Sequence, residues 1–259
     1  MDYQTISKKI RKTVLLMIHK AQTSHISSNF GCIDLLTVLY LNKKPEDEII
    51  ISKGWVAATI YALLAETGVI PKKDLKRYCK PNETKYIGLA EPMEGIKCAG
   101  GSMQIGVGMA VGCALAKKLK GEKGKVYVVE SDGGMNGGII WESLAIASHH
   151  RLNNLILITE LNGLQAMGKT EEILNMNPLD EKLKAFGCEV RKVDGNNHDS
   201  IERALSYPVL YKDKPIAIIA KTIKGKGVSF FEADNKWHYL HVDKNDYKLA
   251  MEELNASNN

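Results

Sequence analysis

Cysteine is scarce in this 259-residue chain, and its five cysteines show no Cys-x-x-Cys spacing. Closely spaced cysteine pairs are the usual ligands of structural zinc, so we expect no zinc site. The chain begins with MDYQTISKKIRK, which lacks the apolar core of a secretion signal, and no apolar run is long enough for a membrane helix. We therefore expect reduced thiols, a cytoplasmic location and no membrane partner.

Aromatic residues are also few, at 7% of the chain, and the formal net charge is only +5. Nucleic-acid-binding surfaces combine a basic face with interleaved aromatic rings. No segment shows that combination, so we expect no nucleic-acid partner. Lysines gather at 117–125 and 221–226. They suit either solvated loops or the attraction of a phosphorylated substrate or anionic cofactor, and composition alone leaves both interpretations open.

The sequence does contain a regular alternation of short apolar runs and amphipathic stretches, which is typical of a parallel sheet crossed by helices. The expected strands are Glu48–Ser52, Cys188–Val193, Pro215–Ile223 and two more within 125–162, separated by a helix. The other expected helices lie near 6–18, 34–41, 56–66, 71–79, 102–120, 180–186 and 200–205. Residues 80–101 lack periodicity and predict an irregular, functional loop. With no repeat and no linker, we predict one doubly wound α/β domain over residues 1–259, with a mainly parallel sheet flanked by helices.

The most informative stretch runs from Lys125 to Asn162. Its pattern predicts a buried strand, the turn Ser131-Asp132-Gly133, a crossover helix and a second buried strand. Asp132 and Asn162, which are 162 − 132 = 30 residues apart, would then emerge together at the carboxyl edge of neighbouring strands, where open α/β sheets bind ligands. A carboxylate, an amide oxygen and nearby backbone carbonyls favour a site for Mg²⁺ or Ca²⁺.

Four segments together resemble the diphosphate-binding, N-terminal part of transketolases. They are ISKGWVAATIYALLAETG, GGSMQIGVGMAVGCALAKKLKG, SDGGMNGGIIWESLAIASHHRLNNLILITELNGLQAMGKTEEIL and KPIAIIAKTIKGKGVSFFEADNKWHY. The resemblance covers nearly the whole chain in order. It implies the thiamine diphosphate-binding fold, with thiamine diphosphate and Mg²⁺ (or Ca²⁺) as cofactors. The SDG, WHY and GKGVSF variants look most like stand-alone N-terminal subunits of specialised sugar metabolism.

The resemblance also implies roles for individual residues around the cofactor. Asp132 and Asn162 match the two side-chain ligands of the metal, and Leu164 matches a residue whose backbone carbonyl is the third protein ligand. Gly133 matches the glycine that lets the backbone approach the diphosphate. Bridging of protein oxygens to phosphate oxygens by Mg²⁺ gives this arrangement a physical basis.

A second group of residues matches family contacts to the ring of the cofactor and to the substrate. Gly101, Ser102 and Met103 match the loop that approaches the aminopyrimidine ring. His25 matches a histidine that contacts a substrate hydroxyl, and it is our candidate catalytic residue. His238 matches a histidine near the diphosphate or the substrate phosphate. For both histidines, an ordinary surface or hydrogen-bonded core role is the alternative.

The chain departs from the family pattern at several polar positions. Trp55 stands where the family segment SKGH has its histidine, and Leu89 aligns with a second family histidine. Gly134 and Gly137 replace both acids of the family segment GDGE-x-x-EG, and Gln104–Ile105 replaces a glycine and a polar residue. Two hydrogen-bonding side chains and two carboxylates are therefore missing from one cleft, where Trp55 would stack on a ring or wall off part of the pocket.

Transketolases also need a pyrimidine-binding domain, whose glutamate activates the cofactor, and we expect this domain and the C-terminal domain on a separate chain. The resulting prediction is a split transketolase-like transferase, a hetero-oligomer with a dimeric core in which this chain is active only with its partner. It would move a two-carbon ketol unit between sugars or sugar phosphates. The alternatives are a non-catalytic assembly subunit or another thiamine diphosphate-dependent C–C bond enzyme. A nicotinamide dehydrogenase is disfavoured, because no GxGxxG follows the first strand.

Overall fold

A computed structural model describes residues 2–98, 103–207 and 210–256. Within these ranges one sheet of parallel strands runs in the order β1-β2-β3-β5-β4. Its strands are β1 (Glu48–Ile51), β2 (Val126–Ser131), β3 (Leu155–Leu161), β4 (Glu189–Asp194) and β5 (Ile216–Lys221). Each predicted strand is present, and the fold class is confirmed.

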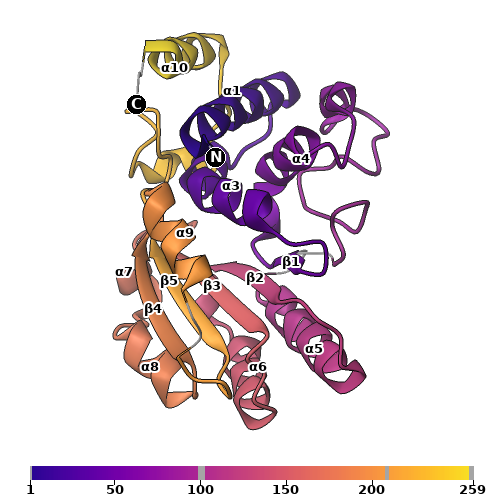
Figure 1. The fold of residues 1–259 in the computed structure, drawn as a ribbon. Helices are drawn as coiled ribbons and strands as arrows, with labels where there is room; N and C mark the ends of the chain where they lie inside the picture. The colour runs from indigo at the N-terminus through magenta and orange to yellow at the C-terminus, as the bar shows by residue number, and fades with distance from the viewer. Residues whose placement is uncertain (1, 99–102, 208–209, 257–259) are drawn as a thin grey trace.

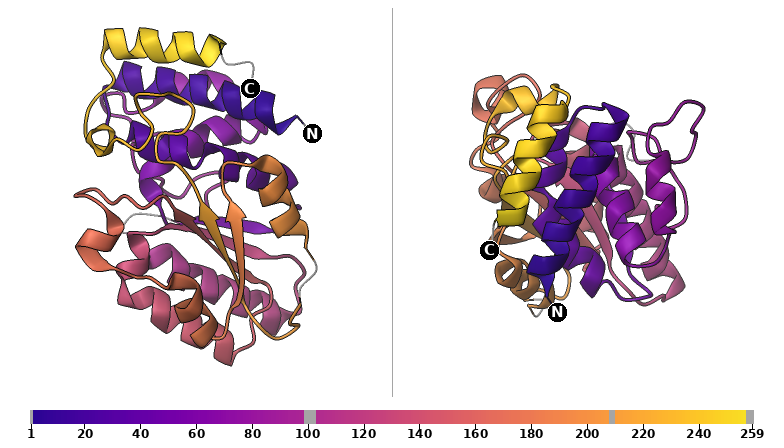
Figure 2. Two further views of the ribbon diagram at one scale, coloured as in Figure 1. Left: turned by 90° about the vertical axis from the view of Figure 1, so that its left-hand side faces the viewer. Right: turned by 90° about the horizontal axis from the view of Figure 1, so that it is seen from above.

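Helices cover both faces of this sheet (Figures 1 and 2). One face carries α1 (Tyr3–Ala21), α3 (Ile33–Asn42), α4 (Ala57–Glu66) and α9 (His198–Ser206), with α10 (Lys244–Ala256) packed on α1. The other face carries α5 (Ile105–Lys120), α6 (Gly138–His149) and α8 (Leu179–Ala185). The short helices α2 (Ile26–Gly31) and α7 (Thr170–Leu174) and the 3-10 segments η1 (Gly54–Val56), η2 (Lys72–Arg77), η3 (Gly134–Asn136) and η4 (Asn235–His238) lie in the connections.

Alternation along the central strands divides the apolar side chains between two cores. On β2, Tyr127 and Val129 pack against the face of α1 and α3, whereas Val126 and Val128 pack against α5 and α6. All six residues of β2 are buried, as expected for a parallel strand covered on both faces. A slip of one residue would exchange the two sets, so the apolar pattern fixes the register.

The main differences from the predicted elements lie in short or polar segments. The sequence pattern missed α2, α7 and α10, and the helix predicted at 71–79 is the 3-10 segment η2. The helix predicted from residue 102 begins as α5 at Ile105, while residues 80–98 contain no helix or strand. In the described ranges, none of the helices is both long enough and apolar enough to cross a membrane.

Candidate cofactor and substrate site

The carboxyl ends of β2 and β3 bring the predicted metal ligands to one edge of the sheet. Ser131 lies beside Glu160 in the parallel register, so Asp132 and Asn162 follow neighbouring strand ends. The Asp132 N–H donates to the Glu160 carbonyl at 3.0 Å, which continues the ladder by one residue. The structure therefore places both residues at the edge that the strand pattern predicted.

The Asp132 carboxylate is buried and held by three donors. Its Oδ1 accepts from the Gly133 N–H at 2.8 Å, and its Oδ2 accepts from the Gly163 N–H at 2.7 Å and from the Thr170 hydroxyl at 3.1 Å. Burial, followed by the nearby Glu160 carboxylate, raises the pKa of Asp132. A bound cation would offset both effects, because it stabilises the charged form.

Asn162 is fixed by contacts on both sides of its amide. Its Oδ1 accepts from the Leu164 N–H at 3.0 Å, and its Nδ2 donates to Glu160 Oε1 at 3.3 Å. The amide oxygen therefore lies over the turn that follows β3. We refer to Asp132, Asn162, Leu164 and Thr170 as the carboxylate corner.

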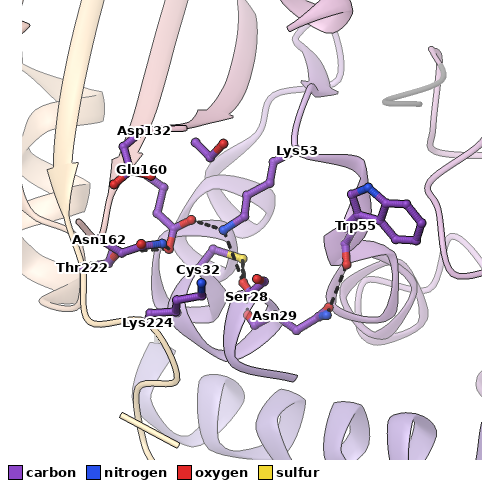
Figure 3. Close-up of polar contacts among 12 residues, drawn as sticks. Ser28, Asn29, Cys32, Lys53, Trp55, Asp132, Glu160, Asn162, Thr222 and Lys224 are labelled. Atoms are coloured by element: carbon purple, nitrogen blue, oxygen red, sulfur yellow. Dashed lines mark hydrogen bonds and ion pairs between the residues drawn. The ribbon is translucent and has the colours of Figure 1, made fainter. Parts of the chain in front are cut away.

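A buried ion pair adjoins this corner (Figure 3). Lys53, just after β1, donates to Glu160 Oε2 and to the Ser28 carbonyl at 3.4 Å. Glu160 is fully buried, and its Oε1 accepts from the Thr222 hydroxyl at 2.9 Å. Burial by itself lowers the pKa of Lys53, but the attraction and hydrogen bond of Glu160, together with Cys32 and Asp132, outweigh it, so the pKa is raised.

A second buried lysine, Lys224, lies near the same carboxylates. Lys224 Nζ donates to the Gln165 carbonyl at 3.3 Å and to Asn235 Oδ1 at 2.8 Å. Burial and then the positive charge of Lys53 lower its pKa to about 8. The two lysines give this part of the site a positive potential that suits an anion.

The sequence analysis did not single out Lys53, Glu160 or Thr222, and it included Lys224 only as a member of the lysine cluster at 221–226. Glu160 could have been found from the sequence, because a charged residue in the buried run LILITEL needs a partner inside the fold. The identity of that partner was not readable, since Lys53 lies 107 positions away. Only the parallel arrangement of the strands brings the two together.

Four aromatic side chains form the end of the site opposite the carboxylate corner. The His25 ring stacks on Trp55 with centroids 4.8 Å apart and an interplanar angle of 7°, and it lies 4.6 Å from the His238 ring. Tyr239 meets His25 edge-on at 6.4 Å. We refer to His25, Trp55, His238 and Tyr239 as the aromatic corner. Trp55 therefore does stack on a ring, and the ring belongs to the protein itself.

Both histidines of the aromatic corner favour the neutral form. Burial, then Lys53 and Lys224, lower the pKa of His25 to about 4. Burial, then Lys224 and His25, lower the pKa of His238 to about 3. A serine hydroxyl bonds each Nδ1, from Ser24 to His25 at 2.7 Å and from Ser28 to His238 at 3.4 Å.

The remaining predicted residues are less informative. Gly101 and Ser102 lie outside the described residues, and Met103, next to them, is exposed. Leu89 lies in the irregular segment, where its carbonyl accepts from the Tyr61 hydroxyl at 3.4 Å. Gly133 packs under Gln165, whose Cγ would lie 3.1 Å from an added Cβ.

The residues present fit a diphosphate with a divalent cation. Asp132 and Asn162 offer the hard oxygens that Mg²⁺ prefers, and they line a cavity of about 410 Å³ together with Thr170 and Thr222. Among the described residues no three acidic, histidine or cysteine side chains cluster in a way that could hold a metal ion. The buried Gln165 Nε2 has no hydrogen-bond partner within the described part of the chain and is a spare donor beside Gly133.

Comparison with known proteins identifies the family of the chain. The chain is 36% identical over 270 residues to one subunit of the apulose-4-phosphate transketolase of Actinobacillus succinogenes, covering 98% of this chain and 97% of that protein. It is 32% identical over 265 residues to the 6-deoxy-6-sulfo-D-fructose transketolase subunit SqwG of a Clostridium species, covering 98% and 96%.

The crystal structure of the transketolase from Campylobacter jejuni superposes with a TM-score of 0.88 and 27% identity. This match covers 98% of the present chain but only 43% of the Campylobacter protein, so the chain spans less than half of that transketolase. Residues 3–257 match the family described as transketolase, thiamine diphosphate binding domain. The chain therefore belongs to the transketolase family and corresponds to its thiamine diphosphate binding domain.

Proposed function

We propose that this chain is the diphosphate-binding subunit of a split transketolase, which transfers a two-carbon ketol unit between sugars. The observation that carries the proposal is the carboxylate corner, where a buried aspartate and an asparagine follow neighbouring strand ends with two buried lysines nearby. The near-complete coverage of two proteins named as transketolase subunits supports a two-chain enzyme.

In this proposal the carboxylate corner holds the cofactors. The side chains of Asp132 and Asn162 and the carbonyl of Leu164 bind Mg²⁺ (or Ca²⁺), while Gly133 and Lys224 face the diphosphate. Thiamine diphosphate, when bound, supplies the carbanion chemistry. The chain itself provides binding, orientation and a site shielded from water.

The aromatic corner would receive the sugar. Because the serine hydroxyls occupy Nδ1 of His25 and His238, Nε2 of each ring is the nitrogen that would meet a substrate hydroxyl. Neutral imidazoles at pH 7 serve either as donor or as acceptor, according to tautomer. Trp55, which is 45% exposed, forms an apolar wall beside them.

This wall favours a sugar with fewer hydroxyls or with a modified end. An indole offers a single N–H and a large apolar face, so it would disfavour the polyhydroxylated chain of an ordinary ketose phosphate. Two relatives are named for apulose-4-phosphate and for 6-deoxy-6-sulfo-D-fructose. We therefore propose a modified sugar, free or phosphorylated, as the donor.

The partner chain would cover an apolar surface on α5 and α6. Ile105 and Met109 lie one helical turn apart on α5, and Ile139 and Ile146 lie two turns apart on the neighbouring α6. All four are exposed in this chain. We propose that a pyrimidine-domain partner, together with a second copy of the heterodimer, buries this surface, giving a hetero-oligomer with a dimeric core.

A non-catalytic assembly role is the second candidate. The stacking of Trp55 on His25 favours it, because one face of the candidate catalytic ring is already covered. The buried, fully held Asp132 disfavours it, since an assembly role needs no such carboxylate.

Reconstitution with the pyrimidine-domain partner separates the two candidates. Each chain alone should be inactive, and the mixture with thiamine diphosphate and Mg²⁺ should transfer two carbons from apulose 4-phosphate or 6-deoxy-6-sulfofructose faster than from xylulose 5-phosphate. A mixture that assembles and binds cofactor but transfers from none of the three donors would favour the assembly role.

A further inference from the structure

The two glycines that replace family acids are not beside empty space. A Cβ added to Gly134 would lie 2.8 Å from Glu130 Cγ and closer still to the carboxyl group of that residue. A Cβ added to Gly137 would lie 2.6 Å from Gln104 Nε2 and closer still to the rest of the amide. Each glycine therefore leaves room for a polar side chain from another segment.

The Glu130 carboxylate lies at the end of β2 and is fully buried. Its Oε2 accepts from the Ser52 hydroxyl at 2.6 Å and from the Gln104 N–H at 2.8 Å. Its Oε1 accepts from the Ser131 N–H at 2.7 Å and from the Ser131 hydroxyl at 3.1 Å. One carboxylate thus ties together the end of β1, the end of β2 and the residue before α5.

Gln104 needs that support because its backbone is strained. It has φ +83°, a left-handed conformation that side-chain-bearing residues rarely adopt. Its N–H also donates to Ser52 Oγ at 3.1 Å. The first turn of α5 packs closely on the same serine, since a Cβ on Gly106 would lie 2.7 Å from Ser52 Cβ.

We propose that Glu130 is a positioning residue which fixes the start of α5, and that Glu130 and Gln104 exclude side chains at positions 134 and 137. Two family carboxylates are thus missing from the turn after β2, and a carboxylate of the strand itself fills the space beside Gly134. The claim rests on the proposed function in one respect, namely that Met103, which precedes Gln104, contacts the cofactor.

A reciprocal exchange tests the exclusion in the isolated chain. Gly134→Glu should lower the unfolding temperature by at least about 5 °C, because two carboxyl groups would compete for one buried space. Glu130→Leu with Gly134→Glu should recover more than half of that loss. Gly138→Glu is the matched control, since a Cβ there meets nothing within 4 Å. If the double variant shows only the sum of its single losses, or if Gly134→Glu is as harmless as the control, the exclusion is wrong.

Cofactor affinity tests the positioning role in the complex with the partner chain. An amide at position 130 cannot accept from both the Gln104 and Ser131 N–H groups, because it replaces one carboxylate oxygen with an NH₂ group, which is a donor. Glu130→Gln should therefore lower the unfolding temperature by a few °C, and at a temperature where the variant is fully folded it should raise the Kd for thiamine diphosphate with Mg²⁺ at least about tenfold. The Glu130→Leu/Gly134→Glu pair should restore the affinity that Glu130→Leu loses.

An unchanged Kd in Glu130→Gln, or a loss that appears only in proportion to lost stability, would leave Glu130 a purely structural residue and overturn its positioning role. The unfolding experiment needs neither partner nor turnover. Failure of the exchange is therefore distinguishable from failure of the proposed transketolase activity, which would show only in the reconstituted assay.

Discussion

The carboxylate corner and the aromatic corner lie at one edge of the sheet, yet they are built in different ways. Asp132 and Asn162 directly follow strands and are held by backbone N–H groups. His25 and Trp55 sit at the starts of short helical segments, and ring stacking holds them. Asp132, Asn162 and Leu164 of the strand-built corner match the family pattern, although Gly134 and Gly137 in the following turn depart from it, whereas Trp55 changes a residue of the helix-built corner itself.

The difference indicates which part of the site is free to vary. A cation and a diphosphate demand a fixed set of oxygens, so replacement of one ligand removes the function of that corner. A sugar is recognised by several hydrogen bonds and an apolar surface, so one histidine can be replaced by an indole with a change of specificity. Lys53 lies between the two corners, because it pairs with Glu160 and lowers the pKa of His25.

The largest expected effect comes from breaking this shared ion pair. Lys53→Met would leave the fully buried Glu160 carboxylate without its cation, and we expect a loss of about 3–5 kcal/mol in the free energy of unfolding. Lys97→Met is the control, because its pair with Glu48 is largely exposed at the lysine and should be worth about 1 kcal/mol or less.

Urea unfolding of both variants gives the comparison. Adding Glu160→Gln to Lys53→Met should recover part of the loss, since the uncompensated charge is gone. Equal losses in Lys53→Met and Lys97→Met would show that the two corners do not share a stabilising centre.

A smaller effect is expected at the aromatic corner, and it should appear in specificity rather than stability. Trp55→His should raise kcat/KM for xylulose 5-phosphate in the reconstituted complex by roughly 10- to 100-fold, because a hydrogen bond to a buried polar group is worth about 1–3 kcal/mol. Trp55→Phe keeps an aromatic ring but provides no hydrogen-bonding nitrogen, so it should not raise kcat/KM for xylulose 5-phosphate. The same gain in both variants would show that bulk, and not a lost hydrogen bond, distinguishes this corner.

The smallest expected effect is a pH dependence of stability. The folded pKa values of His25 and His238, about 4 and about 3, lie below the ordinary 6.5. Unfolding therefore takes up protons at pH values between the folded pKa values and 6.5. The stability from the neutral rings is fully present above about pH 6.5 and is lost as the pH falls toward 4. Because both rings are partly exposed, the slope per imidazole should stay below about 1.4 kcal/mol per pH unit.

Urea unfolding at pH 7, 6 and 5 measures this slope. In His25→Phe/His238→Phe the slope should be visibly flatter, because only the other titrating groups remain. Identical slopes in the two proteins would mean that the histidines of the aromatic corner are not buried in the neutral form.

Sequence reasoning reached the carboxylate corner because its logic is local. A buried strand followed by Asp132, and another followed by Asn162, place both residues at one edge whenever the strands are parallel neighbours. Sequence reasoning did not identify Lys53 and Lys224 as site residues, because their roles depend on carboxylates that lie far along the chain. Glu130 escaped for a similar reason: Gly134 and Gly137 marked two missing acids, but only packing shows that Glu130 and Gln104 occupy their space.

Some elements were missed for want of a clear pattern. α7 has five residues, too few to show helical periodicity, and α10 is mostly polar, with Ala250 and Leu254 buried. The pairing of Trp55 with His25 is a contact between loops from different connections, which no spacing in the sequence encodes. These contacts follow from the assembled sheet and not from any one segment.

Calorimetry of the complex with thiamine diphosphate and Mg²⁺ tests the central claim most directly. The native chain, mixed with its partner, should bind the cofactor with one site per heterodimer. Asp132→Ala should abolish that binding, because the buried carboxylate is the charged oxygen ligand that this chain offers. Asp213→Ala, at an exposed carboxylate, should bind as the native chain does. Undiminished binding by Asp132→Ala would contradict the assignment of the carboxylate corner as the cofactor and metal site.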